Sequence, residues 1–235
     1  MLKKLDTKIS AKNILKSLPN FLTELDSEDF MRKTYINEPT GDFFYNPWQL
    51  KNEFKKEPIV NLFNQLGPVG EARIIVLKPG DGYPAHADID DRYHITLQGE
   101  HSYLIDLDNA KMYPTLVDDC CYLMDTARVH TAANFGYVDR IQLVIRKLLH
   151  NVQLKDPVNV KAKLIDPPYN VRFIFDQTVS VWLNLANKKN VIKSFKQTSE
   201  YEISFDLEKT CVNELETILK KSKLEYKITY DEILE

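Results

Sequence analysis

The stretch Arg92-Tyr93-His94-Ile95-Thr96-Leu97-Gln98 alternates polar side chains with apolar or aromatic ones. Successive side chains of an extended strand point to opposite faces, so Arg92, His94, Thr96 and Gln98 share one face. Two interpretations of this polar face stay open. It is either the solvent side of a sheet, which is the commoner case, or the inner wall of a barrel whose apolar outside is covered by helices.

Short strand-like runs lie on both sides of this stretch and are separated by Pro, Gly and Asp or Asn turns. We expect strands at Ala72–Leu77, Arg92–Gln98, Ser102–Leu107, Cys120–Met124 and Arg140–Leu149. Short strands at this spacing are typical of a sandwich or a barrel.

The part before the strands, residues 1–70, is predicted to be mainly helical. Ser10 suits the cap of a first helix, and a second helical period runs from Leu22 to Met31. Pro58 suits the first turn of a further helix, which the Gly67-Pro68 pair ends.

The part after the strands has a different pattern, with Pro-containing linkers or turns at Asp156-Pro157 and Asp166–Pro168. We therefore divide the chain into a domain of residues 1–152 and a small α+β domain of residues 153–235, whose role the sequence does not reveal. The expected elements of the second domain are strands at Val171–Phe175, Tyr201–Phe205 and Leu224–Tyr230, a helix from Leu207 to Lys221, and an apolar segment at Val179–Leu185 that fits either strand or helix.

Composition excludes several classes of protein. Lys and Arg number 31 against 34 Asp and Glu, which gives no basic arm for nucleic acid. Apolar runs such as Ile74–Leu77 are far shorter than the roughly 20 residues of a membrane span, and the first residues lack the apolar stretch of a secretory signal. Cys120, Cys121 and Cys211 have neither a disulfide nor a zinc spacing. We expect a cytoplasmic protein with no membrane or nucleic-acid partner; its oligomeric state stays open.

Five histidines carry most of the chemical information. His86-Ala87-Asp88 puts an imidazole and a carboxylate on the same side of an extended chain, and His130 lies at the edge of a later strand. Brought together in a barrel, such residues match the facial triad of non-haem Fe(II) oxygenases, although a His-x-Asp pair alone is a weak signal. Simpler roles are expected for His101 in a hairpin turn and His150 at a strand end. Asp90, Asp91, Asp118 and Asp119 are expected to form turns, with the alternative that an acid beside the metal orients a cationic group of a substrate.

Arg140 opens a strand ten residues after His130. On the inner face of a barrel, its guanidinium can bind the far carboxylate of a dicarboxylic co-substrate through two parallel hydrogen bonds, which Lys cannot reproduce. The alternative is a surface arginine paired with Asp139.

Together these residues resemble the 2-oxoglutarate- and Fe(II)-dependent oxygenases, in particular the aspartyl/asparaginyl β-hydroxylase-like branch that includes bacterial proline hydroxylases. The resemblance covers roughly residues 71–149, and the Arg-x-His element marks the branch. The residues that carry it are Leu77-Lys78-Pro79-Gly80, His86-Ala87-Asp88, Arg92-Tyr93-His94, His130 and Arg140.

This resemblance implies a fold that is mainly β with flanking helices. Its core is a double-stranded β-helix, a cupin-like jelly roll, over residues 71–149. It also implies Fe(II) held by His86, Asp88 and His130, 2-oxoglutarate held by Arg140 with help from Arg92 and His94, and O2 as a further substrate. Some relatives carry Gly where Asp88 stands, so the carboxylate here indicates a three-ligand site. Ile74-Ile75-Val76 stands where relatives can offer a hydroxyl to the co-substrate.

The implied reaction is hydroxylation of a C–H bond with release of succinate and CO2. The resemblance alone suggests an amino acid, free or within a polypeptide, as substrate. Arg128, Tyr45 and Trp48 are candidate substrate residues, and the aromatic loop Gly41–Trp48 either walls a pocket or caps the barrel. Two alternatives stay open: a cupin-like structural or interaction module that binds metal without turnover, and a cupin isomerase or epimerase, against which the spacing of Arg140 argues.

Overall fold

The computed structural model describes residues 2–18, 31–165, 177–199 and 201–232. The chain divides into two compact units, one of Met1–His86 and Asp90–Leu148 and the other of Ala87–Ile89 and Leu149–Glu235. Within these described ranges, no helix combines the length and the hydropathy that a bilayer span requires.

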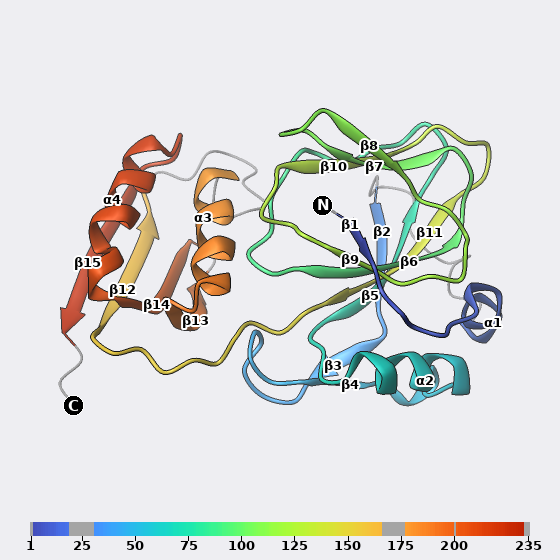
Figure 1. Ribbon diagram of the computed structural model, residues 1–235, viewed down its shortest axis with the longest axis horizontal. Coiled ribbons are helices and arrows are strands. Elements are labelled where there is room, and N and C mark those ends of the chain that lie inside the picture. The colour runs from blue at the N-terminus through green and yellow to red at the C-terminus, as the bar shows by residue number, and fades with distance from the viewer. Residues whose placement is uncertain (1, 19–30, 166–176, 200, 233–235) are drawn as a thin grey trace. The chain divides into compact units, whose positions relative to one another are not determined.

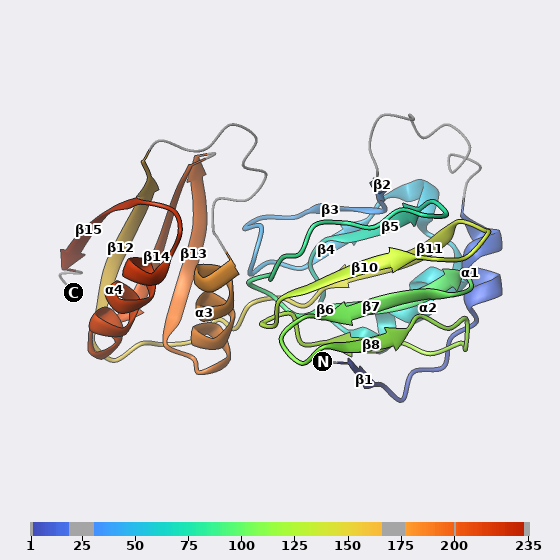
Figure 2. The ribbon, with the colours of Figure 1, turned by 90° about the horizontal axis from the view of Figure 1, so that it is seen from above.

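The first unit is a double-stranded β-helix made of two antiparallel sheets (Figures 1 and 2). The larger sheet has the order β1-β9-β6-β11-β5-β2 and the smaller one the order β10-β7-β8. The larger sheet contains β1 (Leu2–Lys4), β2 (Met31–Tyr35), β5 (Ala72–Leu77), β6 (Arg92–Gln98), β9 (Tyr122–Met124) and β11 (Arg140–Arg146), and the smaller one β7 (Ser102–Asp106), β8 (Lys111–Pro114) and β10 (His130–Asn134). The segment before β6 joins the smaller sheet through bridges at Gly82–Ala133 and His86–His130. From β5 to β11 the chain therefore passes repeatedly between the two sheets, as a jelly roll does.

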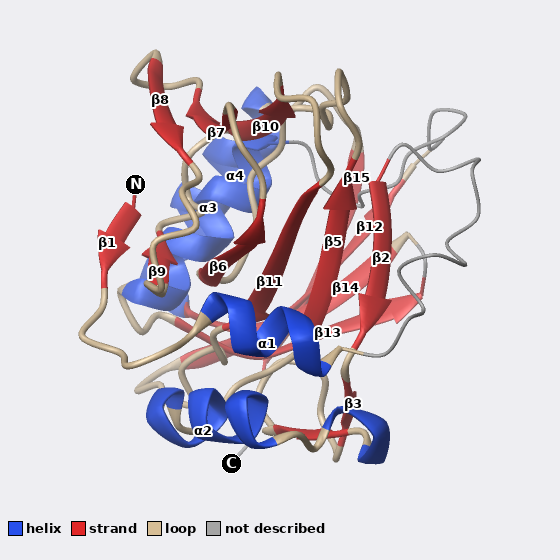
Figure 3. Ribbon diagram, turned by 90° about the vertical axis from the view of Figure 1, so that its right-hand side faces the viewer, coloured by secondary structure: helices blue, strands red, loops and turns tan. Residues whose placement is uncertain are grey.

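The larger sheet has an apolar outer face and a polar inner face. Ile141, Leu143 and Ile145 of β11 pack in one cluster with residues of α1 (Ala11–Ser17) and α2 (Glu57–Leu66), which lie along this sheet (Figure 3). His94 and Thr96 of β6 are each only 8% exposed. The barrel interpretation of the alternating stretch is thus confirmed, and the solvent-facing one is wrong.

Both helices begin as their sequences predict, and α2 also ends as predicted. The Ser10 side chain caps α1 by accepting a hydrogen bond from the Asn13 amide. Pro58 lies in the first turn of α2, and Gly67 ends the helix with a φ of 75°, a conformation that favours glycine.

The prediction that residues 1–70 are mainly helical is wrong, because this region also holds β1, β2, β3 (Asn37–Pro39), β4 (Trp48–Leu50) and the 3-10 turn η2 (Asn52–Phe54). β2 forms because β5 offers a free sheet edge with which it pairs from Met31↔Leu77 to Tyr35↔Arg73, a long-range contact that local periodicity does not reveal. The helix expected over Leu22–Met31 lies outside the described residues, except for Met31, which starts β2.

In the smaller sheet, β8 was not expected from the sequence, and β10 was expected only as a strand edge at His130. β8 and β10 both pair with β7. β10 reads His-Thr-Ala-Ala-Asn, and Ala and Asn have weak strand propensity, so its extended form depends on its partner. The predicted strands at Ala72–Leu77 and Arg92–Gln98 have the observed bounds, whereas β7, β9 and β11 are shorter than expected.

The second unit is an α+β domain with a four-stranded antiparallel sheet of order β13-β14-β12-β15. Its elements are β12 (Pro157–Leu164), α3 (Gln177–Lys188), β13 (Ile192–Ser199), β14 (Glu202–Glu208), η3 (Lys209–Cys211), α4 (Val212–Lys221) and β15 (Tyr226–Glu232). At the linker or turn expected for Asp156-Pro157, Asp156 lies in a bend and Pro157 is the first residue of β12, a strand position that proline can occupy. The ambiguous segment Val179–Leu185 is helical, β13 was not expected, and Val171–Phe175 lies outside the described residues.

Candidate metal centre and the polar interior of the barrel

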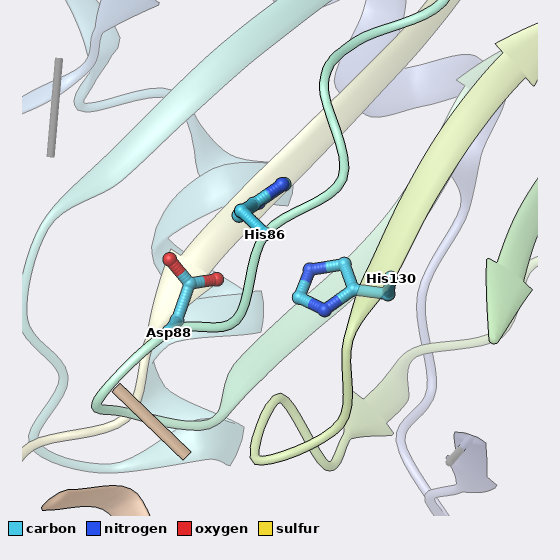
Figure 4. Close-up of side chains that lie close together, drawn as sticks. All are labelled: His86, Asp88 and His130. Atoms are coloured by element: carbon cyan, nitrogen blue, oxygen red, sulfur yellow. The ribbon is translucent and has the colours of Figure 1, made fainter. Parts of the chain in front are cut away.

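His86, Asp88 and His130 come together at the edge of the smaller sheet (Figure 4). The His86 amide donates to the His130 carbonyl at 2.9 Å, and the His130 amide donates back to the His86 carbonyl at 2.8 Å. The imidazole centroids are 4.4 Å apart. Each of the three residues offers one ligand atom, and these atoms all lie within 4.8 Å of one another, a spacing that suits one metal ion.

The ring orientations of both histidines fit metal binding. Nδ1 of His86 lies 2.9 Å from the Pro84 carbonyl oxygen, and Nδ1 of His130 lies 2.8 Å from the Arg128 carbonyl oxygen. A carbonyl oxygen only accepts, so each Nδ1 donates to it and Nε2 is the nitrogen that a metal would use. Metal-binding histidines are usually held in this way by their second nitrogen. With the Asp88 carboxylate, the three residues fit the donor set of an Fe(II) facial triad.

Arg140 lies in the interior of the barrel and is 1% exposed. Its Nη2 donates to Gln142 Oε1 at 2.5 Å, and Gln142 Nε2 donates to Thr96 Oγ1 at 3.0 Å. Arg140 also makes a side-chain hydrogen bond with Tyr83. The alternative of a surface arginine paired with Asp139 is therefore wrong.

The interior around Arg140 has an excess of positive charge. Within the described part of the chain, no carboxylate lies at ion-pair distance from its guanidinium, and its pKa is lowered by burial, an effect that Tyr83 partly offsets. His94 Nδ1 lies 3.3 Å from Gln142 Oε1. Burial and then the Arg140 charge lower the pKa of His94 to about 3, so this imidazole is neutral near pH 7. A buried guanidinium beside a neutral histidine suits a carboxylate ligand.

Arg92 lies in a different group of residues, with its Nε 2.9 Å from Asp90 Oδ1. Asp90 is 2% exposed and forms a second ion pair with Arg146, so the expectation that it merely forms a turn is wrong. A buried carboxylate requires charged partners, and here β6 and β11 supply one each.

Of the three candidate substrate residues, Arg128 precedes β10, whereas Tyr45 and Trp48 belong to the aromatic loop Gly41–Trp48. Arg128 is half-buried and its Nε lies 3.7 Å from Asp125 Oδ2, while its backbone carbonyl contacts His130 Nδ1. Trp48 Nε1 donates to the Phe43 carbonyl at 3.2 Å, and the Tyr45 amide donates to Asp42 Oδ1 at 3.2 Å.

Two other members of the aromatic loop, Phe43 and Phe44, contact the Arg146 guanidinium, whose carbon lies 4.3 and 4.7 Å from their ring centroids. The remaining histidines are not among the clustered ligands: His101 occupies a turn with a φ of 48°, and His150 Nδ1 contacts Asn190 Oδ1 at 2.8 Å.

Four interior residues were not identified as site residues from the sequence: Tyr83, Thr96, Gln142 and Arg146. Thr96 shares a strand face with His94, and Gln142 and Arg146 share one with Arg140, so strand alternation contains a signal for these three. Tyr83 comes from the loop before His86, and its position depends on tertiary structure.

No family model matches the chain, and a search of curated proteins finds no match. Among solved structures, it is similar to a 2OG-Fe(II) oxygenase family oxidoreductase from Burkholderia pseudomallei (12% identity, TM-score 0.41, 57% of this chain and 73% of that one). It is also similar to a prolyl-4-hydroxylase from Pseudomonas putida (12% identity, TM-score 0.41, 63% and 93%). A third similar structure is a predicted oxalate decarboxylase from Thermotoga maritima (19% identity, TM-score 0.33, 51% and 81%). These likenesses are distant, so the chemistry of the site has to be derived from its own residues.

Proposed function

We propose that the protein is a 2-oxoglutarate- and Fe(II)-dependent oxygenase that hydroxylates a C–H bond of an amino acid, free or within a polypeptide. The observation that carries this proposal is the buried Arg140 guanidinium, which lacks a carboxylate partner among the described residues and lies in the same barrel as the His86, Asp88 and His130 cluster. A metal triad and a buried anion site together are what a chelating dicarboxylic co-substrate requires.

Iron held by His86, Asp88 and His130 would supply, with 2-oxoglutarate and O2, the oxidation of a C–H bond and would release succinate and CO2. The protein contributes the positions and orientations of the ligand side chains. The carbonyls of Pro84 and Arg128 accept from the Nδ1 atoms and so orient the two imidazole rings for a metal at Nε2.

Arg140 is the proposed anchor for the far carboxylate of 2-oxoglutarate. Gln142 and Tyr83 hold its guanidinium, so little side-chain freedom is lost when the ligand binds. Exclusion of water from this interior strengthens the ionic contact. His94 stays neutral and therefore adds a hydrogen-bonding group to the anion site without a second charge.

The Arg92-Tyr93-His94 element is the basis for assigning the protein to the aspartyl/asparaginyl β-hydroxylase-like branch. We further propose a cytoplasmic location. Arg92 and His94 remain proposed helpers of co-substrate binding, and Arg128, Tyr45 and Trp48 remain proposed substrate contacts.

The test uses the full chain, purified without metal and then loaded with Fe(II) under anaerobic conditions. After air is admitted, consumption of 2-oxoglutarate and release of succinate are measured with a panel of amino acids and peptides. Consumption should require Fe(II) and O2, should be lost in His130→Ala, and should persist in the matched control His150→Ala. Metal binding without any 2-oxoglutarate consumption would overturn the proposal and favour a structural or interaction module. Metal-dependent turnover without an O2 requirement would favour an isomerase.

A further inference from the structure

A second group of buried charges, here called the Arg146 cluster, consists of Glu71, Arg73, Asp90, Arg92 and Arg146. Arg73 Nη1 lies 2.9 Å from Glu71 Oε1, and Arg92 Nη1 lies 4.0 Å from the same oxygen. Arg92 Nε lies 2.9 Å from Asp90 Oδ1, and Arg146 Nε pairs with Asp90 Oδ2. All five residues belong to the first unit.

The cluster holds three guanidinium groups against two carboxylates. Arg146 and Asp90 are each 2% exposed, and Glu71 is also buried. Leaving the N–H groups of a buried arginine without a hydrogen-bond partner is costly, so the partners of Arg146 decide what this cluster can bind.

The side chain with an open hydrogen-bonding edge is Arg146. Its Nε engages Asp90, and the rings of Phe43 and Phe44 contact its guanidinium. Among the residues that the structure describes, neither Nη1 nor Nη2 has a hydrogen-bond partner. These two nitrogens form the fork that a carboxylate binds with two parallel hydrogen bonds.

This fork is separate from the Arg140 site. Arg140 contacts Gln142 and Tyr83, whereas Arg146 contacts Asp90, Phe43 and Phe44, so these two sets of partners are different. The two arginines are six residues apart on β11, which corresponds to about 20 Å along a strand. One short dicarboxylate held at Arg140 therefore does not also fill the Arg146 fork.

The cluster is nonetheless next to the metal triad. Asp90 follows the ligand Asp88 by two residues, and Arg92 pairs with Arg146 in the strand register. Arg92 and His130 both act electrostatically on His94, which places all three in one neighbourhood. An acid bound at Arg146 would thus lie on the side of the barrel where a substrate has to meet the metal.

We propose that the Arg146 fork binds the carboxylate of the substrate, so that the substrate class is a small organic acid such as an amino acid with a free carboxylate. This inference rests on the proposed oxygenase function and narrows it. Phe43 is 41% exposed while the guanidinium beneath it is buried, so movement of this ring admits the acid and its face then contacts the apolar part of the ligand.

The test compares acids with their own amides. Wild-type full chain is loaded with Mn(II), which binds in place of Fe(II), and with 2-oxoglutarate, and is titrated by calorimetry with a panel of amino acids and the matching primary amides. At least one acid should bind, and its amide should bind about 10-fold more weakly or worse, the scale expected for losing a charge-assisted hydrogen bond.

Substitutions of Arg146 test whether its guanidinium causes the preference for the acid over the amide. Arg146→Gln should weaken binding of the acid about 10-fold or more, leave binding of the amide unchanged, and leave 2-oxoglutarate affinity unchanged. If Arg146→Gln does not fold, Arg146→Lys keeps the charge, loses the fork, and should still lose the preference for the acid. Lys111→Gln, which removes an exposed positive charge on β8, should keep that preference.

Three outcomes would overturn the inference: equal affinities for acids and amides, an acid preference that survives both Arg146 variants, or no binding by any acid of the panel. The same samples also report 2-oxoglutarate binding and consumption. Normal 2-oxoglutarate turnover without an acid preference would reject the Arg146 site alone. An acid preference that depends on Arg146, with no 2-oxoglutarate consumption, would instead reject the oxygenase proposal and leave a carboxylate-binding site.

Discussion

His86 and His130 exchange both backbone hydrogen bonds, and each imidazole is held through Nδ1 by the carbonyl oxygen two residues before it. The same contact between Nδ1 and a nearby carbonyl oxygen therefore occurs twice, once in a loop and once at the start of β10. The direct pairing of the two backbones then sets the distance between the rings. The geometry of this pair therefore depends on main-chain contacts, which substitution of a neighbouring side chain disturbs little.

The side chains of the proposed ligands bind the metal and are not needed for folding. His130→Ala and Asp88→Ala should therefore each remove tight metal binding while the chain still folds. The loss should exceed the roughly 10–100-fold effect typical of losing an outer-shell partner. Metal content by mass spectrometry and calorimetric titration with Mn(II) would measure it. His150→Ala, whose ring contacts Asn190, is the matched control. Full metal content in both ligand variants would reject the triad.

Arg140→Lys keeps a positive charge in the interior but loses the planar fork. We expect 2-oxoglutarate affinity to fall by roughly 1.5–3 kcal/mol, the range for hydrogen bonds to charged groups. Metal affinity should not change, because the ligands are other residues. Calorimetry with 2-oxoglutarate on Mn(II)-loaded protein tests this, and an unchanged affinity would move the co-substrate anchor away from Arg140.

The sequence predicted two barrel strands with their exact bounds: β5, a nearly continuous apolar run, and β6, in which polar and apolar residues alternate. It did not decide whether the polar face of β6 points to solvent or into a barrel, because that depends on which elements cover the apolar face. Here α1 and α2 cover it, and they lie far from β6 along the chain. Local pattern alone does not contain that information.

The candidate ligands and Arg140 were found because their types and spacing are unusual, whereas Asp90 was misjudged. Its local context indicates a turn, and its charge partner Arg146 lies 56 residues away. Gln142 and Arg146 were visible on the face of Arg140 but have no distinctive chemistry of their own. Their importance follows from burial, which only the folded chain defines.

Gln142 is expected to be the central support of the Arg140 site, since its amide group contacts Arg140, Thr96 and His94. Gln142→Leu leaves buried polar groups without this partner and should reduce the free energy of unfolding by about 1–3 kcal/mol. Urea denaturation measures the change. The control Gln98→Leu removes one hydrogen bond to the Asp139 carbonyl at a half-buried position and should cost less. Equal costs would contradict the central role of Gln142.

His94 should make stability sensitive to acid. Its pKa is about 3 in the folded chain against an ordinary value of 6.5, so the unfolded chain binds the proton first as pH falls. The contribution of His94 is complete above about pH 6.5 and is lost progressively as pH falls from there towards 3, at roughly 1 kcal/mol per pH unit. Unfolding free energies of wild type and His94→Gln between pH 7 and pH 4 should therefore converge as pH falls. Parallel curves would show that His94 is not buried in its neutral form.

Asp90 is the only described carboxylate that pairs with Arg146, and both residues are almost fully buried. Asp90→Ala should therefore lower the free energy of unfolding by about 3–5 kcal/mol, the usual cost of removing one partner from a buried ion pair. The double variant Asp90→Leu with Arg146→Met removes both charges and fills the space with apolar groups, so it should recover a large part of this loss. Urea denaturation of the two single variants and the double variant gives the coupling energy. A small cost for Asp90→Ala, within about 1 kcal/mol, would mean that water reaches the guanidinium and that the Arg146 cluster is not the dry anion site inferred from its burial.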